Sequence, residues 1–243
     1  MNTAKEEEGS CLNVNTQQES QTPRKKRGNA GKLKRKELKS RSAWLKARQS
    51  GIGASEAAAV VGLSPWLTAT ELWELKTGIK EDKDKSDDEF ISQGVRLEPV
   101  LRDLFGATHP DYTIEYHPYG ILYQSDRPWL FATLDGELTD KDGRKGILEI
   151  KTATPNGKAG WAKWDNQIPQ QYFVQIVHQL LATKYDYAIL YAALFNQEGN
   201  IFIREYSLEA EDAEMDMEWL LGRETEFWQS VESKSVPAMS IAF

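Results

Sequence analysis

Two neighbouring segments of the chain bring two carboxylates and one ammonium group close together. The first reads Thr-Leu-Asp-Gly-Glu-Leu and contains Asp135, and the second reads Gly-Ile-Leu-Glu-Ile-Lys-Thr and contains Glu149 and Lys151. The dipeptide Asp142-Gly143 between them predicts a β-hairpin, because it favours the tight turns that join antiparallel strands. Side chains alternate across a strand, so Glu149 and Lys151 share one face. We therefore expect the three charged groups at one edge of a sheet.

This set of side chains suits metal-assisted hydrolysis of a phosphodiester. Two adjacent carboxylates repel each other, and a hard divalent cation such as Mg²⁺ prefers oxygen ligands of this kind. A lysine beside them can position or deprotonate the attacking water. The pattern Glu-x-Lys occurs five times in the chain, but only Glu149-Ile150-Lys151 lies in an alternating, apolar and β-branched setting. The other four occurrences are interpreted as solvated charges.

The composition predicts one globular domain with a tail. The chain has 243 residues, of which 40% are hydrophobic, enough for a buried core. Residues 1–33 are polar or basic, so we expect a disordered tail followed by a single domain over residues 34–243. The one cysteine, Cys11, excludes an internal disulfide framework and a cysteine zinc site. With no signal-peptide pattern and no apolar run of membrane-spanning length, a cytoplasmic protein is expected.

Charge is distributed unevenly along the chain. Residues 1–48 hold 13 Lys or Arg and 5 Asp or Glu, a balance of +8, so with a total of −7 residues 49–243 carry −15. An acidic body does not suit nucleic-acid binding over a broad surface. If DNA is the substrate, a local groove, bound metal or the basic arm must hold it. The basic run over residues 24–36 fits either nonspecific DNA affinity or a passive, solvated tail.

A glycine-rich turn forms a second candidate site. Residues 51–62 read Gly-Ile-Gly-Ala-Ser-Glu-Ala-Ala-Ala-Val-Val-Gly, which predicts a turn with Ser55 capping a short helix. Free N–H groups at such a helix start bind anions, and Arg48 could add a fork of donors to a phosphate. On local sequence alone, a well-capped core helix is the preferred interpretation.

A third candidate carboxylate is Glu98. It lies beside Leu97 on the apolar stripe of a predicted helix and precedes Pro99, which either kinks the helix or starts it. A partly buried carboxylate needs a partner, and a metal held by Asp135 and Glu149 would supply one. A surface glutamate near a helix start is the alternative interpretation.

The predicted order of elements is helices, a mainly antiparallel sheet, a helix, two more strands and a closing helix. Gln175 and His178 lie three residues apart on one of these helices, and His178 is interpreted as a core or surface histidine rather than a metal ligand. Helices are expected over residues 34–48, 70–77, about 90–105, 169–183 and 209–233, further strands over 112–116, 120–123, 129–133, 187–195 and 200–206, and a loop over 154–167.

Five separated motifs, taken in order, resemble those of a known family. They are Trp44-x3-Arg48-x2-Gly51 with Gly53-Ala54-Ser55-Glu56, then Gly94-x3-Glu98 with Leu104-Phe105, then Leu134-Asp135-Gly136, then Leu148-Glu149-Ile150-Lys151, and last Tyr172-x2-Gln175. The chain resembles the phage lambda exonuclease type, also called the YqaJ viral recombinase family, within the PD-(D/E)XK nuclease superfamily. The resemblance runs from about Trp44 to the end and leaves out the basic N-terminal extension. Each motif alone is weak, but the ordered set is specific.

The resemblance implies roles for the residues of the first site. Asp135 and Glu149 match the family's metal-binding carboxylates, and the main-chain carbonyl of Ile150 would add a ligand. Glu98 matches the helix carboxylate that completes the metal site. Lys151 matches the catalytic lysine that acts on the attacking water.

The resemblance also implies roles outside the metal site. Gln175 matches the glutamine that supports the lysine and the water. Arg48 and Ser55 match the residues that hold the terminal 5′ phosphate of the cut strand. This reverses the preference for a bland core helix at the glycine turn, because a bland helix does not require the arginine and the serine at the family spacing.

The resemblance implies an α/β protein with a restriction-endonuclease-like core, in which helices flank a mixed, mainly antiparallel sheet. Its activity would be that of a Mg²⁺-dependent 5′→3′ exonuclease on linear double-stranded DNA, with two metal ions per site and Mn²⁺ as an alternative. Digestion would leave 3′ single strands for a single-strand annealing protein in a bacterial or phage-infected cell. The expected partners are DNA ends, the annealing protein and further copies of the chain in a homo-oligomer, by resemblance a trimer, with no membrane partner.

Two other classes of function fit parts of the pattern. A related endonuclease or a CRISPR-associated nuclease of the same fold is the alternative enzyme, although one cysteine excludes an iron–sulfur version. A non-catalytic DNA-end-binding recombination protein is the alternative outside enzymes. The intact set of Glu98, Asp135, Glu149 and Lys151 argues against that second alternative.

Overall fold

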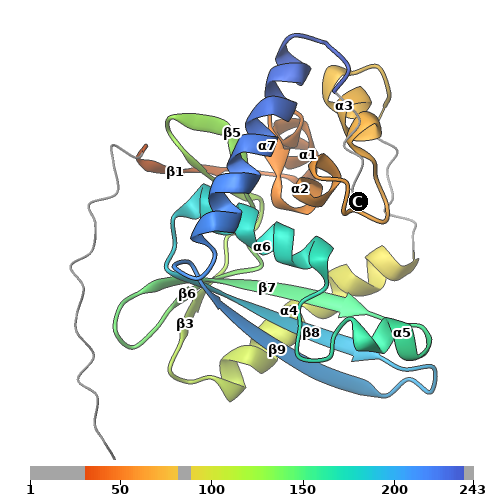
Figure 1. Ribbon diagram of the computed structural model, residues 1–243. Coiled ribbons are helices and arrows are strands. Elements are labelled where there is room, and N and C mark those ends of the chain that lie inside the picture. The colour runs from red at the N-terminus through yellow and green to blue at the C-terminus, as the bar shows by residue number, and fades with distance from the viewer. Residues whose placement is uncertain (1–30, 82–88, 238–243) are drawn as a thin grey trace, which may run out of the picture. The chain divides into compact units, whose positions relative to one another are not determined.

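The computed structural model describes residues 31–81 and 89–237 (Figure 1). The predicted tail over residues 1–33 lies almost wholly outside this part of the chain, so its boundary stays a prediction. Among the described residues, no helix combines the length and the apolar character that crossing a membrane requires.

The predicted α/β class with mainly antiparallel strands is confirmed, and the strands divide between two sheets. The larger sheet has the order β3-β6-β7-β8-β9. In it β7 and β8 run parallel, and all other neighbours run antiparallel. Its strands are β3 (Thr113–Glu115), β6 (Gly136–Thr139), β7 (Lys145–Ala153), β8 (Tyr187–Phe195) and β9 (Ile201–Glu209).

The predicted hairpin is the pair β6 and β7. Gly136 pairs with Leu148 and Thr139 with Lys145. Gly143 in the turn has a φ of 79°, a backbone conformation that glycine adopts without strain. Because β7 is the middle strand of five, the charged cluster lies within the sheet and not on an edge strand, which corrects the expected position.

Helices cover both faces of β7 (Figure 1). Leu148 and Ile150 pack in the apolar cluster of α4 (Glu89–Thr108), which contributes Leu101 and Phe105. Ile147 packs in a larger cluster together with apolar residues of α6 (Gln170–Thr183). Since residues two apart share a face, Glu149 points toward α6.

The smaller sheet has the order β1-β4-β5-β2, with β2 parallel to β5. The strands are β1 (Leu33–Glu37), β2 (Ile52–Gly53), β4 (Gly120–Gln124) and β5 (Arg127–Ala132), and the helices are α1 (Arg41–Arg48), α2 (Ala54–Val60), α3 (Ala69–Thr77), α5 (Gly157–Ala162) and α7 (Glu214–Glu232). Of these other helices in the described residues, α1, α2 and α3 precede α4 along the chain, α5 follows β7, and α7 follows β9.

The predicted helix over residues 34–48 is wrong in its first part. Residues 33–37 form β1, which pairs antiparallel with β4, and α1 begins only after Ser40, whose hydroxyl accepts a hydrogen bond from the N–H of Ala43. Arg35 also binds Glu137 of β6 through two hydrogen bonds, one of 2.8 Å. These contacts with residues distant in sequence override the local helical pattern.

Two further expectations needed correction. The predicted loop over residues 154–167 contains the short helix α5. Of the two alternatives for Pro99, a helix start is excluded, because α4 runs through this residue. Proline cannot donate to the carbonyl four residues earlier, and both Val95 and Pro99 lie on the exposed side of the helix, where that loss is tolerated.

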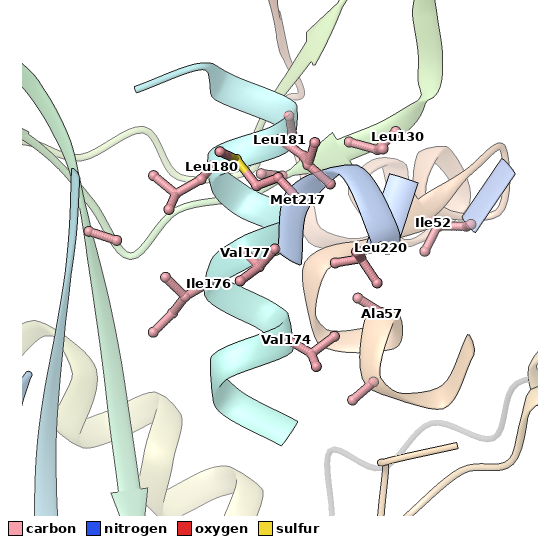
Figure 2. Close-up of a cluster of buried hydrophobic side chains, with 14 of the residues drawn as sticks. Ile52, Ala57, Leu130, Val174, Ile176, Val177, Leu180, Leu181, Met217 and Leu220 are labelled. Carbon is pink, nitrogen blue, oxygen red and sulfur yellow. The ribbon is translucent and has the colours of Figure 1, made fainter. Parts of the chain in front are cut away.

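The larger apolar cluster surrounds α6. Figure 2 shows Val174, Val177 and Leu181 of α6 together with Ala57 of α2 and Leu220 of α7. Ile176 and Leu180 of the same helix belong to the cluster that also contains residues of β7 and β8. α6 is therefore packed on both sides, which fixes its position over β7.

One charged pair lies inside this core. His178 Nδ1 of α6 lies 2.6 Å from Glu224 Oε1 of α7, and His178 Nε2 lies 2.8 Å from the carbonyl oxygen of Phe131. Both side chains are fully buried. Burial lowers the pKa of His178, but the charge and the hydrogen bond of Glu224 outweigh burial and raise it above the ordinary value. His178 thus joins α6, α7 and β5 in the core.

We predict that Glu224→Ala lowers the free energy of unfolding by about 3 kcal/mol, because removing one partner leaves the other buried without its counter-charge. The matched control is Glu226→Ala on the same helix, where an exposed ion pair with Arg223 should contribute at most about 0.5 kcal/mol. Urea unfolding measures both variants. Equal losses in the two would show that the buried pair does not stabilise the fold.

Candidate active site

The carboxylate of Glu149 is the centre of the site. It is 2% exposed. Its Oε1 atom accepts hydrogen bonds from Lys151 Nζ and from Gln175 Nε2, each at 2.5 Å. Its Oε2 atom accepts one from Gln179 Nε2, also at 2.5 Å. The structure therefore brings together three of the predicted residues, Glu149, Lys151 and Gln175.

Gln179 is a site residue that the sequence analysis missed. It lies one helical turn after Gln175 on α6, so both amides face β7. Its side chain is fully buried, and its amide oxygen has no hydrogen-bond partner among the described residues. The sequence offers one signal for this residue. Gln179 follows Gln175 by four residues, so the two glutamines share a helix face that is otherwise apolar.

Asp135 reaches the same strand from the link between β5 and β6. Its Oδ2 atom accepts a hydrogen bond of 2.8 Å from the backbone N–H of Ile150. Its backbone carbonyl accepts one of 2.5 Å from Arg102 Nε of α4. The hydrogen bond from Ile150 holds the Asp135 carboxylate beside the backbone of Ile150, whose carbonyl is the other predicted metal ligand in this segment.

Glu98 approaches from the middle of α4. Its Oε1 atom accepts a hydrogen bond from Arg102 Nη2, one turn further along the helix. The Arg102 guanidinium carbon lies 3.6 Å from the centre of the Tyr116 ring. Arg102 therefore connects Glu98 with the backbone of Asp135, and the sequence analysis missed it. Its position four residues after a candidate ligand was the available signal.

The electrostatics show that the three carboxylates lie within each other's fields. Burial and then the charge of Glu149 raise the pKa of Asp135 well above its ordinary value. Burial raises the pKa of Glu98 as well, and Glu149 adds to that rise while Arg102 opposes it. Because Glu98, Asp135 and Glu149 also repel one another, an added cation would relieve this repulsion.

Lys151 is positively charged in this arrangement. Burial lowers the pKa of Lys151, but the charges of Glu149 and Asp135 together outweigh burial and raise it above the ordinary value. The ammonium group lies 5.4 Å from the centre of the Tyr172 ring. A protonated lysine can donate hydrogen bonds to a water or a phosphate oxygen, and it cannot accept a proton in this state.

The donor set has the chemistry that a hard divalent cation requires. Glu98, Asp135 and Glu149 offer carboxylate oxygens, which are the ligands preferred by Mg²⁺. As the side chains stand, no three His, Cys, Asp or Glu residues within 31–81 and 89–237 lie close enough together to hold a metal ion. The oxygens are instead engaged by Lys151 and Arg102. These cations would have to give up carboxylate contacts for all three carboxylates to bind one ion.

The second candidate site is built around Arg48 and Ser55. Arg48 Nη2 donates a hydrogen bond of 2.9 Å to the exposed hydroxyl of Ser55. The predicted capping role of Ser55 is wrong, because α2 starts after Gly53, whose N–H donates to Glu56 Oε2 at 2.8 Å. Gly51 packs so closely on β5 that a Cβ atom would lie 2.2 Å from the carbonyl oxygen of Trp129. The glycine turn is therefore needed for packing.

A buried ion pair neutralises the one carboxylate beside Arg48. Lys76 Nζ lies 2.8 Å from Glu56 Oε2, whereas Arg48 Nη2 lies 3.7 Å from Glu56 Oε1. Burial raises the pKa of Glu56, but the charges of Lys76 and Arg48 outweigh burial and lower it below the ordinary value. Because the closer Lys76 forms the ion pair with Glu56, the guanidinium of Arg48 can still bind an anion.

Trp44 connects the two candidate sites. Its indole Nε1 donates a hydrogen bond of 3.1 Å to Thr133 Oγ1, two residues before Asp135. The Arg48 guanidinium carbon lies 4.7 Å from the centre of the same indole. The residue that begins the first family motif therefore supports both the arginine and the segment that carries the aspartate.

Comparison with known families identifies the chain. A family model of the YqaJ-like viral recombinase domain matches residues 43–186, which is more than half of the chain. The chain therefore belongs to the YqaJ-like viral recombinase family. The uncharacterized protein YqaJ of Bacillus subtilis strain 168 is 32% identical over 189 residues, which are 78% of this chain and 56% of that protein. The chain thus spans little more than half the length of this relative.

Solved structures show the same fold. An alkaline exonuclease from Laribacter hongkongensis matches with a TM-score of 0.60 and 15% identity, over 80% of this chain and 94% of that chain. A phage-related exonuclease from Haemophilus somnus matches with a TM-score of 0.50 and 12% identity, over 76% of this chain and 96% of that chain. At these identities the matches establish the architecture only.

We predict that Asp135→Asn raises the melting temperature of the metal-free protein at neutral pH. A carboxyl whose pKa is raised by folding stabilises the fold most when it is protonated, and that contribution is lost as the pH rises from the ordinary pKa of aspartate through the raised one. The advantage of the variant should therefore be absent near pH 4 and grow toward pH 8. Thermal unfolding in EDTA across this range measures it.

The control for this prediction is Asp142→Asn in the exposed hairpin turn, which should show no such growth with pH. Added Mg²⁺ should reverse the order of stability. At about 100 times its Kd a ligand stabilises the folded state by about 2.7 kcal/mol, and the wild-type protein should gain more from it than Asp135→Asn. An unchanged melting temperature with Mg²⁺ would argue against the metal site.

Proposed function

We propose that this member of the YqaJ-like viral recombinase family is a metal-dependent nuclease that degrades one strand of linear double-stranded DNA from its 5′ end. The observation that carries the proposal is the buried Glu149 carboxylate, held by Lys151 and two glutamines next to Asp135. Buried charge of this density is costly to a fold and is typical of catalytic sites. The product would be a 3′ single strand, suited to a single-strand annealing protein.

The carboxylates would hold the metal ions. Glu98, Asp135, Glu149 and the main-chain carbonyl of Ile150 are the proposed ligands for two Mg²⁺ ions, or Mn²⁺ in their place. Such ions, when bound, activate a water and stabilise the leaving oxygen in an in-line displacement. The raised pKa values of Asp135 and Glu98 support this assignment.

The remaining residues position the reacting groups. Lys151, which holds its proton on Nζ, would donate a hydrogen bond to the attacking water or to an oxygen of the scissile phosphate. Gln175 and Gln179 grip the two oxygens of Glu149 and so fix the direction in which that carboxylate presents its lone pairs. The two amides thus orient this carboxylate before a metal ion binds.

Arg48 and Ser55 are proposed to hold the 5′ phosphate at the DNA end. Their mutual hydrogen bond places a guanidinium and a hydroxyl at one point of the surface, and a phosphate can accept hydrogen bonds from both. A protein that binds the 5′ phosphate at a DNA end would digest that strand from its 5′ end. The names of the structural relatives, an alkaline exonuclease and a phage-related exonuclease, support an exonuclease over an endonuclease.

Two assembly properties complete the proposal. The chain would act as a homo-oligomer, by its resemblance a trimer, and would hand its product to an annealing protein in a bacterial or phage-infected cell. Both rest on the resemblance alone.

The experiment that tests the activity compares end-labelled linear duplex with closed circular duplex in Mg²⁺ and in EDTA. Wild-type protein should degrade only the linear DNA and only with Mg²⁺. Lys151→Ala should lower turnover by roughly 10²–10⁴-fold, the usual contribution of a group that positions or transfers a proton. Lys145→Ala on the same strand, where the exposed lysine binds Thr139, should digest normally.

Each result of this digest has a defined meaning. Cutting of the closed circle would favour an endonuclease. Binding of ends without any cleavage would favour a non-catalytic recombination protein. Normal turnover in Lys151→Ala would remove the proposed role of that lysine.

We further predict that duplexes with 5′-phosphate ends are digested faster than duplexes with 5′-hydroxyl ends, because an arginine fork binds a dianion much better than a neutral hydroxyl. Arg48→Ala should shrink this preference by about tenfold or more, the effect of losing hydrogen bonds to a charged group, and leave the slower rate on 5′-hydroxyl ends nearly unchanged. Single-turnover rates on the two substrates measure the ratio. Digestion that starts at 3′ ends, or equal rates on both ends, would contradict the terminal-phosphate role.

A further inference from the structure

One large aromatic side chain close to the site is left open to solvent. Trp66, in the link between α2 and α3, is 65% exposed, whereas Trp73 and Trp164 are each 5% exposed. A single exposed apolar side chain is common on protein surfaces and needs no explanation by itself. What distinguishes Trp66 is its anchored backbone and its position near the candidate active site.

The backbone under Trp66 is held in place. The hydroxyl of Ser64 accepts hydrogen bonds of 3.2 Å from the N–H groups of Trp66 and Leu67. The N–H of Leu63 donates to the carbonyl of Ala58 at 2.8 Å, and both Leu63 and Leu67 pack on the apolar core. The ring is thus presented by an anchored turn, which lowers the entropy cost of binding a ligand to it.

The ring lies at the end of an aromatic row that leads to the catalytic lysine. Its centre is 6.2 Å from that of Tyr172, with 38° between the ring planes. Tyr172 lies 5.4 Å from the buried ring of Trp164 on one side and 5.4 Å from Lys151 Nζ on another. Trp66 and Lys151 therefore both lie against the ring of Tyr172.

We propose that Trp66 stacks on an unpaired base of the DNA strand that is being cut. This inference rests on the proposed function, in which a phosphodiester sits beside Lys151. In a nucleotide the base is joined to the phosphate through one sugar. With a phosphate bound at Lys151, a nearby base could therefore reach Trp66, which lies on the other side of the Tyr172 contact. Every base has an aromatic face, so the contact would add affinity without sequence preference.

A second exposed tryptophan shows why the location matters. Trp219 of α7 is 55% exposed, but its neighbours in sequence include Glu214, Asp216 and Glu218, an acidic setting that repels DNA. Trp66 instead packs against Tyr172, whose ring centre lies 5.4 Å from Lys151 Nζ. Trp219 is therefore a matched control for the loss of an exposed indole.

The experiment measures binding to a 5′-phosphorylated duplex whose last three nucleotides are unpaired, with Ca²⁺ in place of Mg²⁺. Fluorescence anisotropy gives the Kd of wild type, Trp66→Ala, Trp66→Phe, Trp66→Leu and Trp219→Ala. Each is measured on the normal strand and on strands with one abasic nucleotide at each unpaired position. Melting temperatures show whether the variants fold as the wild type does.

If Trp66 stacks on a base, the effects on Kd of removing the indole and of removing that base should not add. Trp66→Ala should raise the Kd on the normal strand about tenfold, within the roughly 1–3 kcal/mol that stacking contributes per base. Wild type should lose a similar factor at one abasic position, and Trp66→Ala should lose almost nothing there. Trp66→Phe should bind nearly as wild type does, Trp66→Leu should resemble Trp66→Ala, and Trp219→Ala should have no effect.

Other results would overturn the inference. Equal losses by Trp66→Ala on normal and abasic strands, or equal binding by Trp66→Leu and wild type, would show that no base is stacked. A wild-type protein that digests DNA while Trp66→Ala binds it normally would remove this inference alone. A wild-type protein that neither binds nor digests DNA ends would remove the proposed function and this inference with it.

Discussion

The carboxylate of Glu149 is nearly excluded from water, and much of the structure follows from keeping it there. An unpaired buried charge would destabilise the fold strongly. Lys151, Gln175 and Gln179 compensate by donating to both of its oxygens. Two of these donors come from α6, so α6 must lie against β7. Its opposite side is then covered by α2 and α7 (Figure 2), which gives the hydrophobic core its position.

This constraint explains the division of polar residues along α6. Gln175 and Gln179 face the strand and serve the site, while His178 faces away and joins α7 to β5 through Glu224 and the carbonyl of Phe131. One helix thus provides donors for the buried carboxylate of Glu149 and a buried pair for the core. A change on one side of α6 would therefore also affect the contacts on its other side.

The sequence predicts the features that depend on neighbouring residues. The β6–β7 hairpin follows from alternation and an Asp-Gly turn, and the β8–β9 hairpin from two strand-like runs separated by a turn with Gly199. β1 was mistaken for helix because its partners, β4 and Glu137, lie far along the chain. Gln179 and Arg102 were missed because a buried amide or guanidinium shows its role only when its acceptor is known. The roles of Arg48 and Ser55 came from the family resemblance, since their local sequence favours an ordinary helix start.

The distribution of charge also limits how residues 49–243 could bind DNA. Residues 49–243 carry a formal charge of −15, so attraction to phosphates over a wide surface is not available to them. Binding must rest on a few points where a cation is kept available, such as Arg48, whose acidic neighbour Glu56 is paired with Lys76. Stacking on an aromatic ring is the complementary contribution, because it does not depend on net charge. An exposed, anchored tryptophan close to Tyr172 and Lys151 would supply this contribution in the proposed nuclease.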